Sequence, residues 1–176
     1  MAQVQAPGLP AQANGNIVPE KIRDGIDLEI NGERFHHTGD PQMPLLWFLR
    51  DVLQLTGTKY GGAHAENGTG LVLLDGKEVA AIDQPMSKLA GRRVTTVEGL
   101  AGADGSLHPL QQAFIDEDAI GCGYCTSGWL IAALDLLRRK PHPGDEDIDQ
   151  LPNRCRCGCH TRVRRAIKRA ANGGQP

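Results

Sequence analysis

Hydrophobic and polar residues alternate strictly from Ile26 to Ile30. This period of two is typical of a strand with one buried face. The dipeptide Asn31-Gly32 follows, and because this pair is a strong signal for a two-residue hairpin turn, we expect a second strand through Phe35. The alternation therefore predicts a β-hairpin at the start of the folded part of the chain.

The spacing of apolar residues changes to that of a helix over residues 45–53, which predicts one short amphipathic helix. A glycine-rich loop occupies residues 56–70. Beyond it, apolar runs at 71–74 and 78–82 flank an Asp-Gly turn and predict a second hairpin, and the segment 93–97 predicts a last strand. Strand pairs around a single helix indicate a small α+β sheet domain.

The second half of the chain has a different character. Helical spacing recurs at 108–119, 123–139 and 158–171, and prolines break the chain after the second of these segments. The first 25 residues are polar and contain three prolines, which is typical of a mobile arm. The predicted division is an arm at 1–25, a sheet domain at 26–101, a helical domain at 102–172 and a tail at 173–176.

Composition and charge narrow the classes of protein. The formal net charge is −2, which gives no general field for binding nucleic acid. The sequence has no run of 18 apolar residues, so we expect no membrane span. The N-terminal residues lack the basic and apolar stretches of a secretory signal, and this favours the cytoplasm. The sequence also shows no constellation of a catalytic acid, base and nucleophile.

The five cysteines are the most informative residues, because all of them lie between positions 122 and 159. An odd, clustered set is a poor disulfide framework but a good candidate for a metal site. Cys122 and Cys125 form one pair, Cys155 and Cys157 form a second, and Cys159 follows two residues later. Soft thiolates select zinc, Cu(I) or iron–sulfur clusters. The spacing alone leaves zinc and iron–sulfur equally open, with a redox-active dithiol as a lesser alternative.

Several motifs, met in order along the chain, extend this interpretation. They are LLWFLRDVLQLTGTKYG, LDGKEV, VTTVEGL, HPLQQAF, GCGYCTSGW and NRCRCGCHTRVRRAI. From residue 26 to about residue 170 the chain resembles the small iron–sulfur subunits of the xanthine oxidase family of molybdenum hydroxylases, especially those of the isoquinoline 1-oxidoreductase and bacterial aldehyde dehydrogenase type. The resemblance implies a β-grasp ferredoxin-like domain followed by a four-helix-bundle [2Fe–2S]-binding domain.

By this resemblance, Cys122, Cys125, Cys155 and Cys157 bind the [2Fe–2S] cluster that lies nearest the molybdenum–pterin cofactor of a separate large subunit. The family also places the last ligand, here Cys157, and the residue before the first ligand close to the pterin. That residue is Gly121 in this chain, where the family usually has glutamine. We therefore expect the pterin contact at position 121 to be absent or to be made by the backbone.

The chain departs from the family at four positions in the sheet domain. The family carries four further cysteines there as ligands of a plant-type cluster, and this chain has Gly62, Asn67, Gly70 and Ile82 instead. Glycine and isoleucine offer no ligand, and one asparagine amide cannot replace four thiolates. We expect an empty plant-type site and one [2Fe–2S] cluster per chain.

The implied function is that of an electron-transfer subunit in a complex that oxidises an aldehyde or an N-heterocycle. Electrons would pass from molybdenum through the single cluster to an external acceptor, which could be a cytochrome c or a flavin subunit. The complex could lie in the cytoplasm, or on the periplasmic side if a signal-bearing partner exports it. A zinc-stabilised interaction module and a degenerate assembly subunit without a redox role are the alternatives.

The other polar residues near the cysteines have simpler explanations. We expect Cys159 to be a free thiol beside the cluster, and His160 to lie at the surface or beside the ligands. Arg154 and Arg156 could either raise the reduction potential of the cluster or pair with a partner subunit. Trp129 is expected in the core or at an interface. The cations of the last helix are expected on a solvated or subunit-facing surface.

Overall fold

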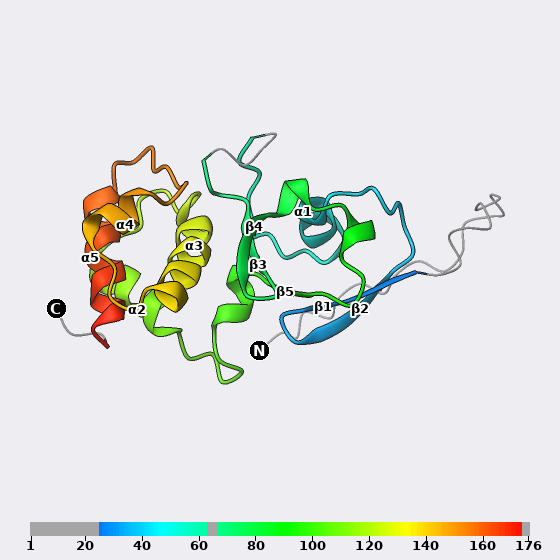
Figure 1. The fold of residues 1–176 in the computed structure, drawn as a ribbon, viewed down its shortest axis with the longest axis horizontal. Coiled ribbons are helices and arrows are strands. Elements are labelled where there is room, and N and C mark those ends of the chain that lie inside the picture. Colours follow the sequence, from blue (N-terminus) through cyan, green and yellow to red (C-terminus); the bar gives the residue numbers. More distant parts are fainter. Residues whose placement is uncertain (1–24, 63–66, 174–176) are drawn as a thin grey trace, which may run out of the picture.

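The structure is a computed structural model that describes residues 25–62 and 67–173. The predicted arm, apart from Gly25, and the last three residues therefore lie outside the described residues. Figure 1 shows a sheet in the middle of the molecule, a short helical segment on one side of it, and the C-terminal helices together on the other side. The chain is α+β, as the hydrophobic pattern predicts.

Five strands in the described part of the chain form one mixed sheet. They are β1 (Ile26–Ile30), β2 (Glu33–His37), β3 (Leu71–Leu74), β4 (Lys77–Ala80) and β5 (Arg93–Thr95). Their order across the sheet is β2-β1-β5-β3-β4. β1 and β5 run parallel, and the other neighbouring pairs are antiparallel. The sheet therefore combines two hairpins with one parallel contact at its centre.

Both predicted hairpins are present. The central residues of the first turn, Asn31-Gly32, have φ of 52° and 85°, and those of the second turn, Asp75-Gly76, have φ of 48° and 82°. Positive φ at both positions is the signature of a type I′ turn, whose twist matches that of the flanking strands. The last strand ends two residues earlier than predicted, because the Thr96 backbone N–H donates to Oδ1 of Asn31 at 2.9 Å rather than to a neighbouring strand.

The helix predicted at 45–53 is present in a modified form. It consists of α1 (Leu45–Trp47) and the π-helical turn η2 (Phe48–Val52). The Leu53 N–H donates to the carbonyl of Phe48, five residues back, at 3.0 Å, so this turn is wider than an α-helical one. Leu45, Leu46, Phe48 and Leu49 still pack into the core against one face of the sheet, whereas Val52 is 55% exposed.

The second half of the described chain contains four helices. They are α2 (Pro109–Asp116), α3 (Thr126–Arg139), α4 (Asp145–Asp149) and α5 (His160–Ala171). The helices α3 and α5 begin later than predicted, because the cysteine-containing segments before them are loops. The short helix α4 is not predicted by hydrophobic spacing, since its sequence is mostly acidic. It starts after Gly144, whose backbone N–H donates to Oδ2 of Asp147 at 2.7 Å.

The strand β3 belongs to two hydrophobic cores at once. Val72 and Leu74 lie in the core beneath α1, whereas Leu71 and Leu73 pack into the core formed by the helices. A strand that is covered on both faces is expected to be apolar throughout, which accounts for the sequence LVLL. The sheet and the helical layer are therefore packed against each other through β3.

Candidate metal centre

The five cysteines lie on two loops that each lead into a helix. Cys122 and Cys125 precede α3, and Cys155, Cys157 and Cys159 precede α5. None of the five forms a disulfide. A helix N-terminus favours negative charge on a nearby sulfur. The helix ends therefore favour thiolates on both loops, whereas burial opposes ionisation at Cys125.

The two loops meet so that cysteines of one face cysteines of the other. The thiol of Cys122 interacts with that of Cys157, and the thiol of Cys125 interacts with that of Cys155. Within the described residues, no three or more His, Cys, Asp or Glu side chains are closed around a single point. The four thiols thus lie as two cross-loop pairs.

Hydrogen bonds divide these thiols into acceptors and donors. The Tyr124 backbone N–H and the Cys157 thiol lower the pKa of Cys122. The pKa of Cys155 is also lowered: its partial burial opposes the change, but hydrogen bonds from the Cys159 backbone N–H and from the Cys125 thiol outweigh it. Burial, together with the hydrogen bond to Cys155, raises the pKa of Cys125 to about 12. One sulfur on each loop is therefore favoured as a thiolate.

This donor set fits a [2Fe–2S] cluster. Such clusters are held by four cysteine thiolates, and the two loops bring together four thiols, a pair from each loop. Cys122 and Cys157 are exposed, whereas Cys125 and Cys155 are half-buried. The two exposed sulfurs lie on the outer side of the group, where a partner subunit could approach them.

Gly121 packs directly against the second loop. A Cβ atom at this position would lie 2.7 Å from Cβ of Cys157 and 3.2 Å from Sγ of Cys159. A side chain here would therefore have to displace Cys157. The two loops approach each other so closely at Gly121 that the glutamine usual in the family would not fit there without a shift of Cys157.

The four positions that lack the expected plant-type ligands have other roles. Oδ1 of Asn67 accepts hydrogen bonds from the backbone N–H of Thr69 at 3.1 Å and from its hydroxyl at 2.8 Å. The carbonyl of Gly70 accepts the Ala81 N–H at 2.9 Å, and Ile82 packs against the sheet core. Gly62 has φ of 102°. Asn67 is the only one of the four with a polar side chain, and that side chain is used within its own turn.

The loop that contains Gly62, Asn67 and Gly70 docks onto both cysteine loops. Asn153 Nδ2 donates to the Gly68 carbonyl at 2.8 Å, and the Arg154 N–H donates to the Asn67 carbonyl at 3.1 Å. The Tyr124 hydroxyl donates to the Tyr60 carbonyl at 2.7 Å. Sequence reasoning did not identify Asn153, because its partner lies 85 residues away and no local pattern marks such a contact.

The residues beside the cysteines make local contacts. His160 Nε2 accepts the Cys155 N–H at 3.2 Å, and the His160 ring packs edge-on against Trp129. Trp129 is buried in the helical core, which is one of the two places expected for it, the core or an interface. Arg154 donates to the carbonyls of Leu151 and Asn153. The Arg154 guanidinium is thus held within its own loop.

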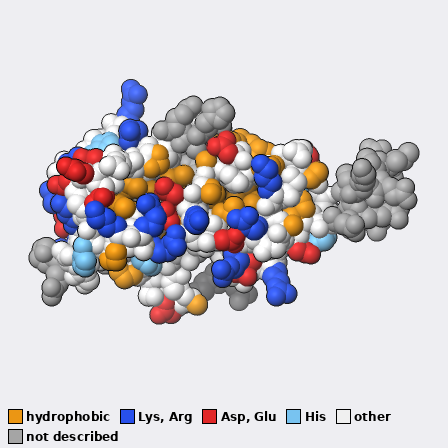
Figure 2. Space-filling model, viewed as in Figure 1, with side chains coloured by type: hydrophobic (Ala, Val, Ile, Leu, Met, Phe, Trp, Pro, Cys, Tyr) orange, Lys and Arg blue, Asp and Glu red, His pale blue; other side chains and the backbone are white. Residues whose placement is uncertain are grey.

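The basic helix α5 is neutralised within the chain. Its cations pair with acids at the end of α2 and on α4. The pairs are Arg162–Asp118, Arg164–Asp149, Arg165–Glu117, Lys168–Asp145 and Arg169–Asp116. Figure 2 shows acidic and basic side chains interleaved on the visible face. No described helix is long and apolar enough to cross a membrane.

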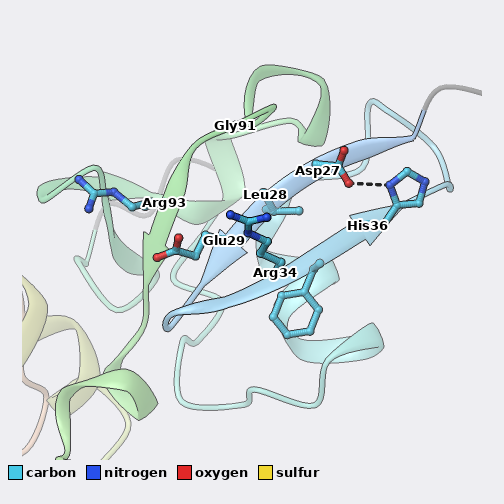
Figure 3. A pocket seen from close by; sticks show the side chains of 8 residues that line it. Asp27, Leu28, Glu29, Arg34, His36, Gly91 and Arg93 are labelled. Carbon is cyan, nitrogen blue, oxygen red and sulfur yellow. Dashed lines mark hydrogen bonds and ion pairs between the residues drawn. The ribbon is translucent and has the colours of Figure 1, made fainter.

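A hollow of about 560 Å³ lies at the β1–β2 end of the sheet, and no cysteine lines it. Figure 3 shows that its charged side chains come from β1, β2 and β5, with Asp27 and His36 paired. Acids and bases alternate around it, as is usual for the solvent-facing side of an antiparallel hairpin. We assign no site to this hollow.

Comparison with known proteins agrees with this geometry. A model of the "[2Fe-2S] binding domain" family matches residues 96–168. The chain is 45% identical to one of the subunits of the nicotinate dehydrogenase of Pseudomonas putida, covering 83% of this chain and 94% of that one. It is 40% identical to the alpha subunit of isoquinoline 1-oxidoreductase of Brevundimonas diminuta, covering 83% of this chain and 97% of that one.

A solved structure shows the same fold. The aldehyde oxidoreductase of Desulfovibrio desulfuricans superposes with a TM-score of 0.78 at 35% identity, over 86% of this chain. This chain corresponds to only 18% of that longer chain. The chain therefore belongs to the small [2Fe–2S] subunits of the xanthine oxidase family of molybdenum hydroxylases, and it is an iron–sulfur electron-transfer subunit of an oxidoreductase complex.

Proposed function

We propose that this chain carries electrons from a molybdenum–pterin cofactor in a large partner subunit to an external acceptor through one [2Fe–2S] cluster. The proposed ligands are Cys122, Cys125, Cys155 and Cys157. The observation that carries the proposal is the cross-loop pairing of these four thiols. When bound, the cluster would accept and release one electron at a time.

The residues of this chain hold and shield that site. The N-termini of α3 and α5 favour negative charge at the ligand sulfurs. Hydrogen bonds to ligand sulfurs stabilise a cluster and tune its potential, and Cys155 accepts several. Cys157 and Gly121 are proposed to lie next to the pterin, since Cys157 is exposed and Gly121 is in contact with it. No side chain at 121 would then reach the pterin.

The proposed number of clusters is one. The strand order β2-β1-β5-β3-β4 supports a β-grasp domain at 26–101, and the helices α2–α5 support a four-helix bundle at 102–172. The β-grasp loop has hydrogen bonds in place of ligands, with Asn67 bonded to Thr69. Without a second cluster in the chain, the single [2Fe–2S] cluster would pass electrons directly to a partner subunit.

A cytochrome c subunit is the proposed acceptor, and a flavin subunit is the alternative. It would dock near the sheet domain, where the second cluster of two-cluster relatives would lie. The proposed substrates of the whole complex are aldehydes or N-heterocycles, because the relatives include enzymes named for both. The proposed location is the cytoplasm, or the periplasmic side if the chain is exported together with a partner.

Metal and sulfide analysis tests the cluster assignment. The purified chain should contain two iron and two acid-labile sulfide atoms, and the reduced protein should give a [2Fe–2S] EPR signal. Four irons per chain would contradict the single-cluster proposal. A colourless protein with one zinc would contradict the redox role altogether.

Purification of the whole complex tests the acceptor. We expect a haem-containing chain to co-purify, and its haem should be reduced when the substrate of the complex is added. A complex with flavin and no haem would contradict the cytochrome proposal while leaving the cluster assignment intact.

A further inference from the structure

Cys159 differs from the other four cysteines in its surroundings. Its side chain is 1% exposed, whereas Cys122 and Cys157 are exposed and the remaining two are half-buried. It lies at the N-cap of α5, and a Cβ atom at Gly121 on the first loop would come within 3.2 Å of its Sγ. It is therefore the most buried of the five cysteines and lies where the two loops approach each other.

Two hydrogen bonds fix the Cys159 side chain. Arg162 Nη2 donates to Cys159 Sγ at 3.3 Å, and the same guanidinium pairs with Asp118. The Cys159 thiol in turn hydrogen-bonds to the Cys155 side chain. A sulfur that accepts a hydrogen bond from a guanidinium must direct its own S–H elsewhere, and Cys155 is the sulfur it meets. The result is a chain of hydrogen bonds from Asp118 through Arg162 and Cys159 to a proposed cluster ligand.

Gly121 makes room for this arrangement. A Cβ atom at position 121 would lie 3.2 Å from Cys159 Sγ, which is closer than a carbon and a sulfur pack comfortably. The thiol at position 159 therefore fits only because position 121 has no side chain. The Cys159 thiol occupies space that a side chain at position 121 would need.

We propose that Cys159 is a positioning residue that donates its S–H to Cys155 and thereby raises the reduction potential of the cluster. A hydrogen bond to a ligand sulfur offsets part of its negative charge, and this favours the reduced, more negative state. Arg162 supports the effect by orienting the thiol. The inference rests on the proposed function, because it requires Cys155 to be a ligand.

The test compares Cys159→Ala with Cys159→Ser in the purified complex. Reduction potentials are measured by EPR-monitored titration, and iron is counted in each variant. Cys159→Ala should keep two irons per chain and show a lower potential than the unsubstituted protein, because the donor is gone. Cys159→Ser retains an O–H donor and should recover most of the shift. Arg162→Gln should move the potential in the same direction as Cys159→Ala.

Several outcomes would overturn the proposal. An unchanged potential in Cys159→Ala with full iron content would mean that the thiol only fills space. Loss of iron in both Cys159 variants would mean that Cys159 is itself a ligand. If Cys159→Ala fails to fold, the comparison of Cys159→Ser with Arg162→Gln decides the matter, and equal potentials in all forms would refute the tuning role. An unsubstituted protein without iron would instead refute the proposed function.

Discussion

Asn153 links the glycine-rich loop of the sheet domain to the loop that contains Cys155, Cys157 and Cys159. Its side chain is fully buried, and Nδ2 donates to the Gly68 carbonyl at 2.8 Å. The next residue but one is Cys155, and the Arg154 N–H binds the carbonyl of Asn67. The position of the second cysteine loop thus depends on a turn in the sheet domain.

Removing the Asn153 side chain should weaken both the fold and the metal site. Asn153→Ala leaves the Gly68 carbonyl without its partner, and such a loss costs about 1–3 kcal/mol. We expect a lower free energy of unfolding in chemical denaturation and faster loss of iron to a chelator. Asn172→Ala, at an exposed asparagine, is the matched control and should change neither. Equal effects of the two variants would argue against the link.

Glu78 gives the stability of the chain a specific dependence on pH. Burial is the main cause that raises the pKa of Glu78; the nearby Asp135 carboxylate adds to it and Arg139 opposes it. Its Oε2 atom is buried without a hydrogen-bond partner. Because the folded chain holds this proton more tightly than the unfolded chain, stability falls as pH rises from the ordinary glutamate value through the raised one.

Glu78→Gln should therefore stabilise the chain at neutral pH. The gain is at most about 1 kcal/mol, because the side chain is only half-buried and solvent screens part of the cost. It should disappear when the pH is below the ordinary glutamate pKa, where both states are protonated. Unfolding measured across pH checks this, with the exposed Glu33→Gln as control. A gain that persists in acid would show that charge is not its cause.

The helix α5 is held to its neighbours by ion pairs as well as by its apolar face. Glu117 at the end of α2 pairs with Arg165 at 2.9 Å and with Arg169 at 3.4 Å. Val163, Ala166 and Ile167 are buried on the opposite face. Because a buried apolar side chain contributes more than a partly exposed ion pair, packing is expected to provide most of the stability of this contact.

Glu117→Gln should reduce the stability of this helix pair by a small amount that depends on salt. Partly exposed ion pairs contribute about 0.2–1 kcal/mol each, and salt screens them. We expect a lower melting temperature in dilute buffer and a smaller difference in concentrated salt. The same loss at both salt concentrations would indicate that packing, not charge, is affected.

The elements that sequence predicts well are those with local causes. Both hairpins follow from their turn dipeptides, and the two pairs of cysteines mark the site because their spacing is short. The π-helical turn η2 has the same hydrophobic spacing as an α-helix, and α4 has no apolar period. The bond of Asn153 and the burial of Glu78 depend on contacts between the sheet and the helices, which no local pattern reveals.

At the scale of the whole molecule, the two halves approach each other closely at the backbone of Gly68 and Gly128. Gly128 on α3 approaches the Gly68 carbonyl so closely that a Cβ atom at 128 would lie 1.9 Å from that oxygen. β3 extends this contact, because it contributes side chains to both cores. A shift of α3 away from the Gly68 carbonyl should therefore disturb the sheet half and the helical half together.

Gly128→Ala tests that coupling. Overpacking of this kind costs about 1–3 kcal/mol, and the neighbour here is backbone that cannot move aside alone. We expect a lower melting temperature, with sheet and helix signals shifting together, and a smaller iron content. Gly144→Ala is the matched control, since its new methyl group would meet only the Asp147 side chain at 3.4 Å. Separate transitions for the two halves would contradict the coupling.

Under the proposal of a single cluster, the backbone at Gly62 would make a second cluster site difficult to restore. Its φ of 102° lies in a region that L-residues rarely adopt, so a cysteine restored there would be strained before any metal could bind. The other three cysteines would bring no benefit until all four were present. Restoring one cysteine at a time would therefore either strain the backbone or bring no gain in metal binding.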